Sequence, residues 1–286
     1  MEESEKVEHY STPENTESRT GTIVPTPNDP PWNSPIAFGT WIISVLLIVL
    51  LPTLFLLPYA MTLKPPIVAS EALVEFAKTD PTAILLQILS IFPAHILTLV
   101  FAWIVVTRGR KYSFRKMLGW ESGGISWWYY PVILFAFLAI AAAVSSISPE
   151  QDNDLLRILR SSRSAVYLVA FLATFTAPIV EEIVYRGVLY SAFQRSIGVP
   201  AAFCLVTFLF ALVHVPQYYP SYSTIFLLVL LSVSLTALRV KSKNLLPCII
   251  LHTLFNGFQS FILIIEPFLA KPETSPAPAF INQLLK

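Results

Sequence analysis

Apolar residues along this chain are gathered into seven long blocks that are separated by short polar stretches. Each block is near the length of about 20 residues that an α-helix needs to cross the hydrocarbon core of a bilayer. The pattern therefore predicts an all-α fold, a polytopic bundle of about seven transmembrane helices. The blocks lie near residues 36–61, 82–107, 127–148, 165–191, 199–215, 223–240 and 245–265.

Two shorter segments have an amphipathic order of apolar and charged residues. Residues 66–78 are short and charged, so we expect a helix at the membrane interface, with an eighth embedded helix as the alternative. Residues 152–163 have a similar pattern and are also expected to lie on a surface. The aromatic residues 127–130 open the third block, as aromatic belts do where a helix enters a bilayer.

Composition changes sharply at both ends of the apolar region. Residues 1–35 contain six prolines, many Ser, Thr and Glu residues and almost no aliphatic ones. Such a stretch buries too little apolar surface to offset its ordering entropy, so we expect a disordered N-terminal tail. The helical bundle is predicted over residues 36–265. Residues 266–286 are expected to form a short polar C-terminal tail.

The overall composition sets the class of protein. Of the 286 residues, 55% are hydrophobic and 13% are charged, whereas soluble domains have about 25% charged residues. A water-soluble enzyme is therefore excluded, and we expect an integral, multi-pass membrane protein surrounded by lipid. The net charge of +1 provides no basic excess, so no nucleic-acid partner is expected.

Lys and Arg residues predict which way the bundle faces. Residues 108–116 contain five of them, the densest cluster in the chain, and basic loops favour the cytoplasmic side. With that loop inside, the N-terminus is also inside, together with 11 basic residues against seven outside. We therefore expect a cytoplasmic N-terminus, in the plasma membrane of a bacterium.

The fourth apolar block contains three charged residues, Glu181, Glu182 and Arg186. A charged group at the centre of a bilayer costs roughly 2.5–3.5 kcal/mol even on a lenient scale, so these side chains must face the protein interior. Glu182 and Arg186 are four residues apart and share one helix face, which predicts a salt bridge. Glu181 points about 100° away. It is left without that partner and can act as a base.

Two further blocks bring protic groups to membrane depth. His214 lies at the end of the fifth block, and His252 and Asn256 share one face of the seventh. With Glu181 they have the composition of a hydrolytic site, in which a carboxylate and an imidazole take a proton from water and a second imidazole with an amide holds an oxyanion. His95 has no such companion in its block, so we expect an ordinary packed, hydrogen-bonded side chain.

Three motifs on these blocks resemble those of a known family. They are APIVEEIVYRGVL at 177–189, FALVHVP at 210–216 and CIILHTLFNGF at 248–258. In that order they match the EExxxR, FxxxH and HxxxN motifs of the CAAX prenyl protease type II and bacteriocin-processing family, abbreviated CPBP. The resemblance covers a protease core at about residues 127–265.

The resemblance implies an intramembrane endopeptidase. Carried onto this chain, Glu181 is the catalytic glutamate, which activates water together with His214. His252 and Asn256 match the residues that stabilise the oxyanion, and Glu182 and Arg186 match the accompanying acid and base. The implied substrate is a peptide or protein at the membrane, either a prenylated CaaX-type protein or a bacteriocin or leader peptide.

The cofactor and the function each have an alternative at this point. Family members are commonly called metalloproteases, and one Glu with two His residues is a donor set that holds Zn²⁺. HExxH is absent, however, and the ligands would come from three separate helices, so we favour water activation without a metal or other cofactor. A non-enzymatic bacteriocin self-immunity protein and a transporter or proton relay are the alternative functions, because buried Glu and His residues also serve in proton relays.

Overall fold

The computed structural model describes residues 24–269, and over this range the secondary structure is helical, without a named β-strand. Seven helical segments in this range are long and apolar enough to cross a membrane. They confirm the predicted polytopic helical bundle. The spans are α1 (Ser34–Thr62), α3 (Pro81–Thr107), α5 (Tyr129–Ile147), a composite helix (Arg163–Ile197), α10 (Val199–Tyr218), α11 (Tyr222–Ser242) and α12 (Leu246–Leu269).

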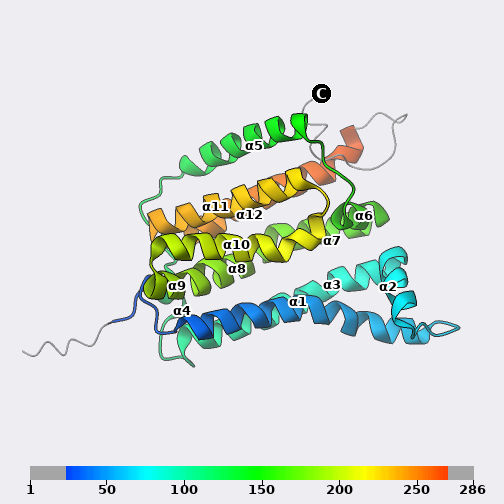
Figure 1. Ribbon diagram of the computed structural model, residues 1–286, viewed down its shortest axis with the longest axis horizontal. Helices are drawn as coiled ribbons and strands as arrows, with labels where there is room; N and C mark the ends of the chain where they lie inside the picture. Colours follow the sequence, from blue (N-terminus) through cyan, green and yellow to red (C-terminus); the bar gives the residue numbers. More distant parts are fainter. Residues whose placement is uncertain (1–23, 270–286) are drawn as a thin grey trace, which may run out of the picture.

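The spans run side by side, with the composite helix between two groups (Figure 1). One buried apolar cluster joins α1 and α3 to the second half of the composite helix and to α10. A second cluster joins α5 to α11 and α12. Large apolar side chains are exposed on α1 and α3, for example Leu50, Leu54 and Val100, as expected for helices whose outer faces contact lipid.

Three short helices lie at the ends of the spans (Figure 1). The helices α2 (Ser70–Thr79) and α6 (Asp154–Ser161) fall on the two segments that were expected to be amphipathic helices. Asn153 caps α6 by accepting a hydrogen bond from the Leu156 backbone N–H at 3.0 Å, which is the role that asparagine commonly has at a helix N-terminus. The third, α4 (Phe114–Leu118), was not foreseen from the sequence.

The composite helix changes width twice along its length. Its parts are α7 (Arg163–Phe171), the π-helical turn η1 (Leu172–Thr176), α8 (Ala177–Glu182), the π-helical turn η2 (Ile183–Leu189) and α9 (Tyr190–Ile197). In η1 the Ala177 N–H bonds to the Leu172 carbonyl, five residues back. Pro178 follows directly and has no N–H to donate. The wider turn accommodates the proline without ending the helix, and it displaces the Ala173 carbonyl from its usual i+4 partner.

Side chains from other elements bind backbone carbonyls in and around these wide turns. Asn256 Nδ2 donates to the Ala173 oxygen at 2.9 Å, and Ser260 Oγ donates to the Ala170 oxygen at 3.3 Å. In η2, Arg239 Nε donates to the Arg186 oxygen at 3.3 Å and Trp32 Nε1 to the Val188 oxygen at 3.0 Å. Because a π-turn shifts carbonyls out of the regular ladder, these donors from the N-terminal segment, α11 and α12 help to fix the shape of the composite helix.

The prediction of a disordered tail over residues 1–35 is wrong for its last part. Residues 24–33 pack against the bundle, and α1 starts at Ser34. Trp32 is 1% exposed. Asn28 Oδ1 accepts hydrogen bonds from Arg239 at 2.9 Å and Gln194 at 3.1 Å. A polar composition averaged over 35 residues concealed a few side chains that fill the end of the bundle. The rest of that predicted tail, residues 1–23, lies outside the described residues.

At the other end, α12 continues to Leu269. Residues 266–269 of the predicted C-terminal tail are therefore helical, and residues 270–286 lie outside the described residues.

Candidate active site

Glu182 and Arg186 form a salt bridge within the composite helix. Arg186 Nη1 lies 2.9 Å from Glu182 Oε1, and both side chains are 0% exposed. The predicted pairing is therefore present. Removing either partner alone would leave a buried charge without compensation, which is far more costly than the pair itself.

Helix α11 completes the surroundings of Arg186. The Nη2 atom donates to the backbone carbonyl of Ser232 at 3.0 Å and to its hydroxyl at 2.7 Å. The Nε atom donates to Thr236 Oγ1 at 3.3 Å, and the guanidinium lies 4.6 Å from the ring centre of Phe210. Sequence reasoning missed this helix, because Ser and Thr in an apolar block are also common as ordinary packing residues.

Glu182 also orients the imidazole of His252. His252 Nδ1 lies 2.8 Å from Glu182 Oε1. Because Glu182 Oε1 also accepts a hydrogen bond from Arg186 Nη1, we assign the proton to Nδ1, which donates to the same oxygen, and the lone pair to Nε2. The second carboxylate oxygen, Oε2, is buried without a protein hydrogen-bond partner among the described residues.

Glu181 faces a different neighbourhood from Glu182. Its Oε1 lies 3.8 Å from His214 Nε2, its Oε2 lies 3.8 Å from His252 Nε2, and its side chain is 22% exposed. Both separations exceed hydrogen-bond length. A polar contact at such a distance is suited to a bridging water. Three segments of the bundle therefore bring one carboxylate and two imidazoles together around a small polar space.

The spacing of Phe210 and His214 sets the tautomer of His214. His214 Nδ1 lies 2.7 Å from the Phe210 carbonyl oxygen, one turn earlier in α10. A carbonyl can only accept, so Nδ1 carries the hydrogen and Nε2 presents its lone pair towards Glu181. The Phe210 ring lies 4.7 Å from the His214 ring and 6.1 Å from the His252 ring, between centroids. The aromatic ring therefore packs against both imidazoles.

Asn256 lies one turn beyond His252 on α12. One N–H of its amide donates to the Ala173 carbonyl, which the wide turn η1 displaces. Of the six residues singled out in the sequence, His214 and His252 lie nearest Glu181, each with its Nε2 atom 3.8 Å from a carboxylate oxygen. Glu182 and Arg186 lie behind His252, and Asn256 supports the helix turn that precedes Glu181.

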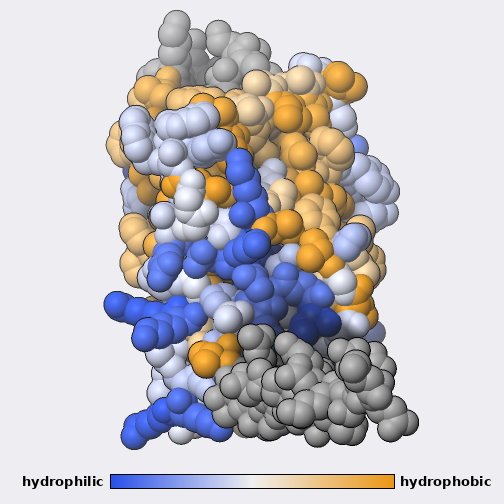
Figure 2. Space-filling view, turned by 90° about the vertical axis from the view of Figure 1, so that its left-hand side faces the viewer, coloured by the Kyte–Doolittle hydropathy of each residue, from blue (hydrophilic) through white to orange (hydrophobic). Residues whose placement is uncertain are grey.

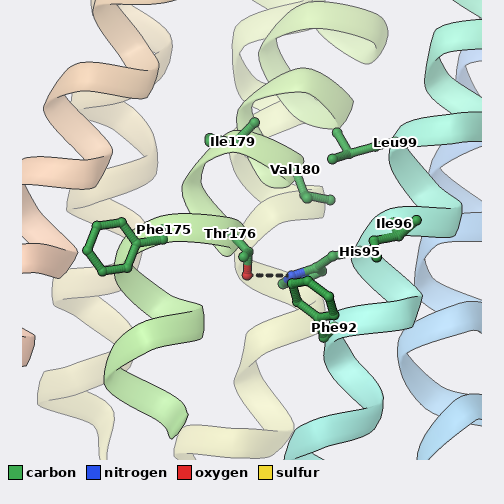
Figure 3. Close-up of a pocket in the computed structure, with 8 residues that line it drawn as sticks. All are labelled: Phe92, His95, Ile96, Leu99, Phe175, Thr176, Ile179 and Val180. Atoms are coloured by element: carbon green, nitrogen blue, oxygen red, sulfur yellow. Dashed lines mark hydrogen bonds between the residues drawn. The ribbon is translucent and has the colours of Figure 1, made fainter. Parts of the chain in front are cut away.

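A cavity of about 130 Å³ lies beside this site, between α3 and the turn that leads to Glu181 (Figure 3). His95 lines it, and its Nδ1 lies 2.8 Å from Thr176 Oγ1. This is the packed, hydrogen-bonded role that the sequence suggested for His95. The lining is otherwise mainly apolar and consists of Phe92, Ile96, Leu99, Phe175, Ile179 and Val180.

The side chains around Glu181 are of the types that bind zinc, but the distances between their ligand atoms are longer than in a zinc site. Two imidazole Nε2 atoms and a carboxylate converge, and each imidazole donates its other N–H to an oxygen, as metal-bound histidines do. Tetrahedral zinc ligands at about 2.0–2.2 Å from the metal lie about 3.3 Å apart, less than the 3.8 Å found here. Within residues 24–269, no group of three His, Cys, Asp or Glu side chains is arranged to hold a metal ion. The prediction of a metal-free reaction is not tested by this geometry.

Comparison with known proteins supports the resemblance seen in the sequence. Residues 163–258 match the family described as type II CAAX prenyl endopeptidase Rce1-like. This range contains all three motifs, from Glu181 to Asn256. No curated protein and no solved structure matches the chain.

Proposed function

Because its core, residues 163–258, matches the Rce1-like type II CAAX prenyl endopeptidases, we propose that this membrane protein is an intramembrane endopeptidase that hydrolyses a peptide bond of a membrane-associated substrate. The observation that carries the proposal is the position of Glu181. It lies between the Nε2 atoms of His214 and His252, at 3.8 Å from each.

The attacking water would occupy the space between Glu181 and the imidazoles. Glu181 takes one proton from the water, and the lone pair on His214 Nε2 accepts a hydrogen bond from the other O–H. The water oxygen then adds to the scissile carbonyl. The resulting intermediate collapses with loss of the amine, and Glu181 returns its proton to that amine. General base and general acid are thus the same carboxylate at successive steps.

His252 and Asn256 would stabilise the oxyanion, each with a hydrogen from a specific atom. The neutral tautomer of His252 presents a lone pair at Nε2, so in this role His252 must enter the reaction already protonated, with the extra proton on Nε2 taken from solvent before water attacks. Glu182, bonded to Nδ1 at 2.8 Å, stabilises that cation as a carboxylate does in a serine-protease triad. Asn256 has two N–H groups. One is engaged with Ala173, and the other is assigned to the oxyanion.

We assign the cavity between α3 and η1 to an apolar group of the substrate. Six of its eight lining residues are apolar, and Ile179 and Val180 directly precede Glu181. An apolar group held there would be anchored next to the catalytic carboxylate. Of the two substrate classes considered, a prenylated CaaX-type protein carries such a group close to the bond that is cut, so we favour it over a bacteriocin or leader peptide.

The decisive experiment compares wild type with Glu181→Gln in lipid nanodiscs, using a farnesylated CaaX peptide and its unprenylated counterpart. Mass spectrometry should detect cleavage of the prenylated peptide by the wild type alone, because Gln keeps the shape of Glu but lacks its basicity. Glu266→Gln is the matched control, since Glu266 is also largely buried in a spanning helix. Full activity of a folded Glu181→Gln protein would remove Glu181 from the mechanism.

The same experiment addresses the two alternative functions. A self-immunity protein that acts by binding needs no chemistry at Glu181, and a transporter moves its substrate intact. Absence of any Glu181-dependent product, from prenylated peptides or from the membrane proteome searched for new N-termini, would favour these alternatives over the peptidase.

A further inference from the structure

The polar groups around Glu181 leave few hydrogens free for an oxyanion. The Nδ1–H of His214 is donated to the Phe210 carbonyl, and the Nδ1–H of His252 is donated to Glu182. Asn256 gives one of its N–H groups to a backbone carbonyl. Peptide hydrolysis passes through an intermediate with a negatively charged oxygen, and donors aimed at that oxygen are usually a large part of catalysis. One more preorganised donor would therefore matter.

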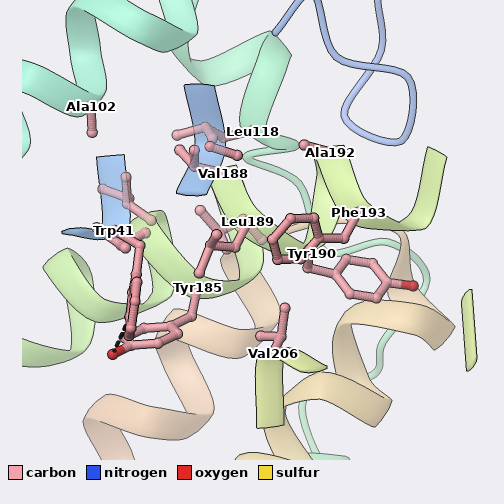
Figure 4. Packing of buried hydrophobic residues seen from close by; sticks show 14 of the residues in the cluster. Trp41, Ala102, Leu118, Tyr185, Val188, Leu189, Tyr190, Ala192, Phe193 and Val206 are labelled. Carbon is pink, nitrogen blue, oxygen red and sulfur yellow. Dashed lines mark hydrogen bonds between the residues drawn. The ribbon is translucent and has the colours of Figure 1, made fainter. Parts of the chain in front are cut away.

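Tyr185 holds a buried hydrogen of this kind. Trp41 Nε1 donates to the Tyr185 hydroxyl oxygen at 3.1 Å (Figure 4). An indole N–H can only donate, so the hydroxyl oxygen is the acceptor and its own hydrogen points elsewhere. Among the hydrogen bonds within residues 24–269, no acceptor takes that hydrogen. Tyr185 is only 5% exposed and Trp41 only 8%, so the hydroxyl hydrogen of Tyr185 is shielded from bulk water.

The position of Tyr185 links it to the catalytic groups. It lies four residues after Glu181, so the two side chains share one face of the composite helix. Its ring meets the Phe210 ring edge-on, with centroids 5.1 Å apart. Phe210 is the same ring that packs against the imidazoles of His214 and His252. Tyr185 therefore belongs to the same cluster of rings as His214 and His252, the two imidazoles that lie 3.8 Å from Glu181.

We propose that the Tyr185 hydroxyl is a further catalytic residue, which donates a hydrogen bond to the oxyanion formed when water adds to the scissile carbonyl. The proposal rests on the proposed peptidase function. Tyr185 keeps its proton throughout, because the proton released by the water goes to Glu181 and then to the leaving amine. Trp41 is a positioning residue: its N–H occupies one lone pair of the hydroxyl oxygen and so limits the directions in which the O–H can point.

The first test is Tyr185→Phe, assayed with the farnesylated CaaX peptide in nanodiscs. We expect kcat to fall about 100-fold with little change in KM, the effect of losing one oxyanion donor. Tyr190→Phe is the matched control, because Tyr190 is also buried on this helix and its hydroxyl points away from that of Tyr185 (Figure 4). The control should keep its kcat.

A second variant separates catalysis from folding. Tyr185→Phe alone leaves the Trp41 N–H buried without an acceptor, which destabilises the fold. Adding Trp41→Phe removes that orphan donor. The double variant should therefore regain thermal stability relative to Tyr185→Phe but should not regain kcat.

The outcomes distinguish failure of the proposed role of Tyr185 from failure of the proposed peptidase function. If folded Tyr185→Phe keeps kcat within about threefold of wild type, or if the double variant regains kcat together with its stability, the role of Tyr185 is structural and the inference is wrong. In both cases the peptidase function stands. If wild type shows no cleavage that depends on Glu181, the proposed function fails and the role of Tyr185 fails with it.

Discussion

Two neighbouring carboxylates, Glu181 and Glu182, have opposite surroundings. Glu182 is fully buried and is bound by Arg186 and His252. Glu181 is partly exposed and has the Nε2 atoms of two imidazoles at 3.8 Å. Groups whose environments differ in this way commonly divide the work of a site. One carboxylate is held as a structural anion that orients His252, and the other is free to accept a proton.

The pairing of Glu182 with Arg186 predicts a specific pattern of stability. Arg186→Ala should lower the folded yield and the melting temperature, because an unpaired buried carboxylate costs about 3–5 kcal/mol. Adding Glu182→Gln removes the charge, and the Gln amide oxygen can still accept from His252 Nδ1. The double variant should therefore recover part of the loss. Size-exclusion profiles and thermal melts of the purified proteins in detergent measure it.

A double variant that folds no better than Arg186→Ala would show that the charge on Glu182 is not what destabilises the single variant. The stabilising effect of Arg186 would then have to come from its contacts with Ser232 and Thr236 on α11. Serine and threonine are weak partners for a buried cation, so this outcome would overturn the assignment of Glu182 as the partner that stabilises Arg186.

The effects of EDTA and of replacing Asn256 test whether the reaction needs zinc. If Glu181 and His214 activate water directly, EDTA should leave activity intact, and Asn256→Ala should lower kcat by roughly 10²–10³ with little change in KM. Its melting temperature should also fall, because the Ala173 carbonyl loses its donor. Metal content, and activity after treatment with EDTA and after addition of zinc, are measured for the wild type and for Asn256→Ala. Rescue of Asn256→Ala by zinc would contradict the metal-free mechanism.

At the scale of the helix, we expect the wide turn η1, which ends five residues before Glu181, to set the direction of that side chain. Pro178→Ala restores an N–H that can compete with Asn256 for the carbonyls of this turn, and a regular helix would then rotate the following residues. We expect kcat to fall about tenfold or more while the melting temperature stays the same or rises. Pro58→Ala, in an exposed part of α1, is the control and should leave kcat unchanged. Unchanged kcat in Pro178→Ala would mean that the wide turn does not position Glu181.

Sequence reasoning predicted the elements better than their inner detail. The bilayer fixes the length of each span, so the ends of the predicted blocks agree with those of the seven helices to within four residues, except that the fourth helix runs to Ile197 and not to 191. The Glu182–Arg186 pair was predictable because a four-residue spacing has only one geometry in a helix. The wide turns were not predictable, because the presence of a proline does not specify whether a helix ends, kinks or widens around it. The contribution of Trp41 was also missed, because one Trp in an apolar block is equally typical of packing.

At the scale of the whole molecule, one end of the bundle is strongly basic. Figure 2 shows hydrophilic side chains gathered on part of this end. The exposed basic residues come from the loop after α3, from α4, from the end of α9 and from the end of α11, and are Arg108, Arg110, Lys111, Arg115, Lys116, Arg195, Lys241 and Lys243. The sequence predicts that this end faces the cytoplasm, because the positive-inside rule counts such short loops.

Cysteine accessibility tests this orientation. Cys204 and Cys248 are free thiols, so they are first replaced by alanine, and Lys111→Cys or Glu75→Cys is then added at exposed positions on opposite ends of the bundle. A membrane-impermeant maleimide should label Glu75→Cys on intact bacterial cells, whereas Lys111→Cys should react only after the membrane is permeabilised. A size-exclusion profile like that of the wild type verifies that each variant is folded. The reverse labelling pattern would place the basic end outside, and with it the N-terminal segment, whose Asn28 is bonded to Arg239 at the end of α11.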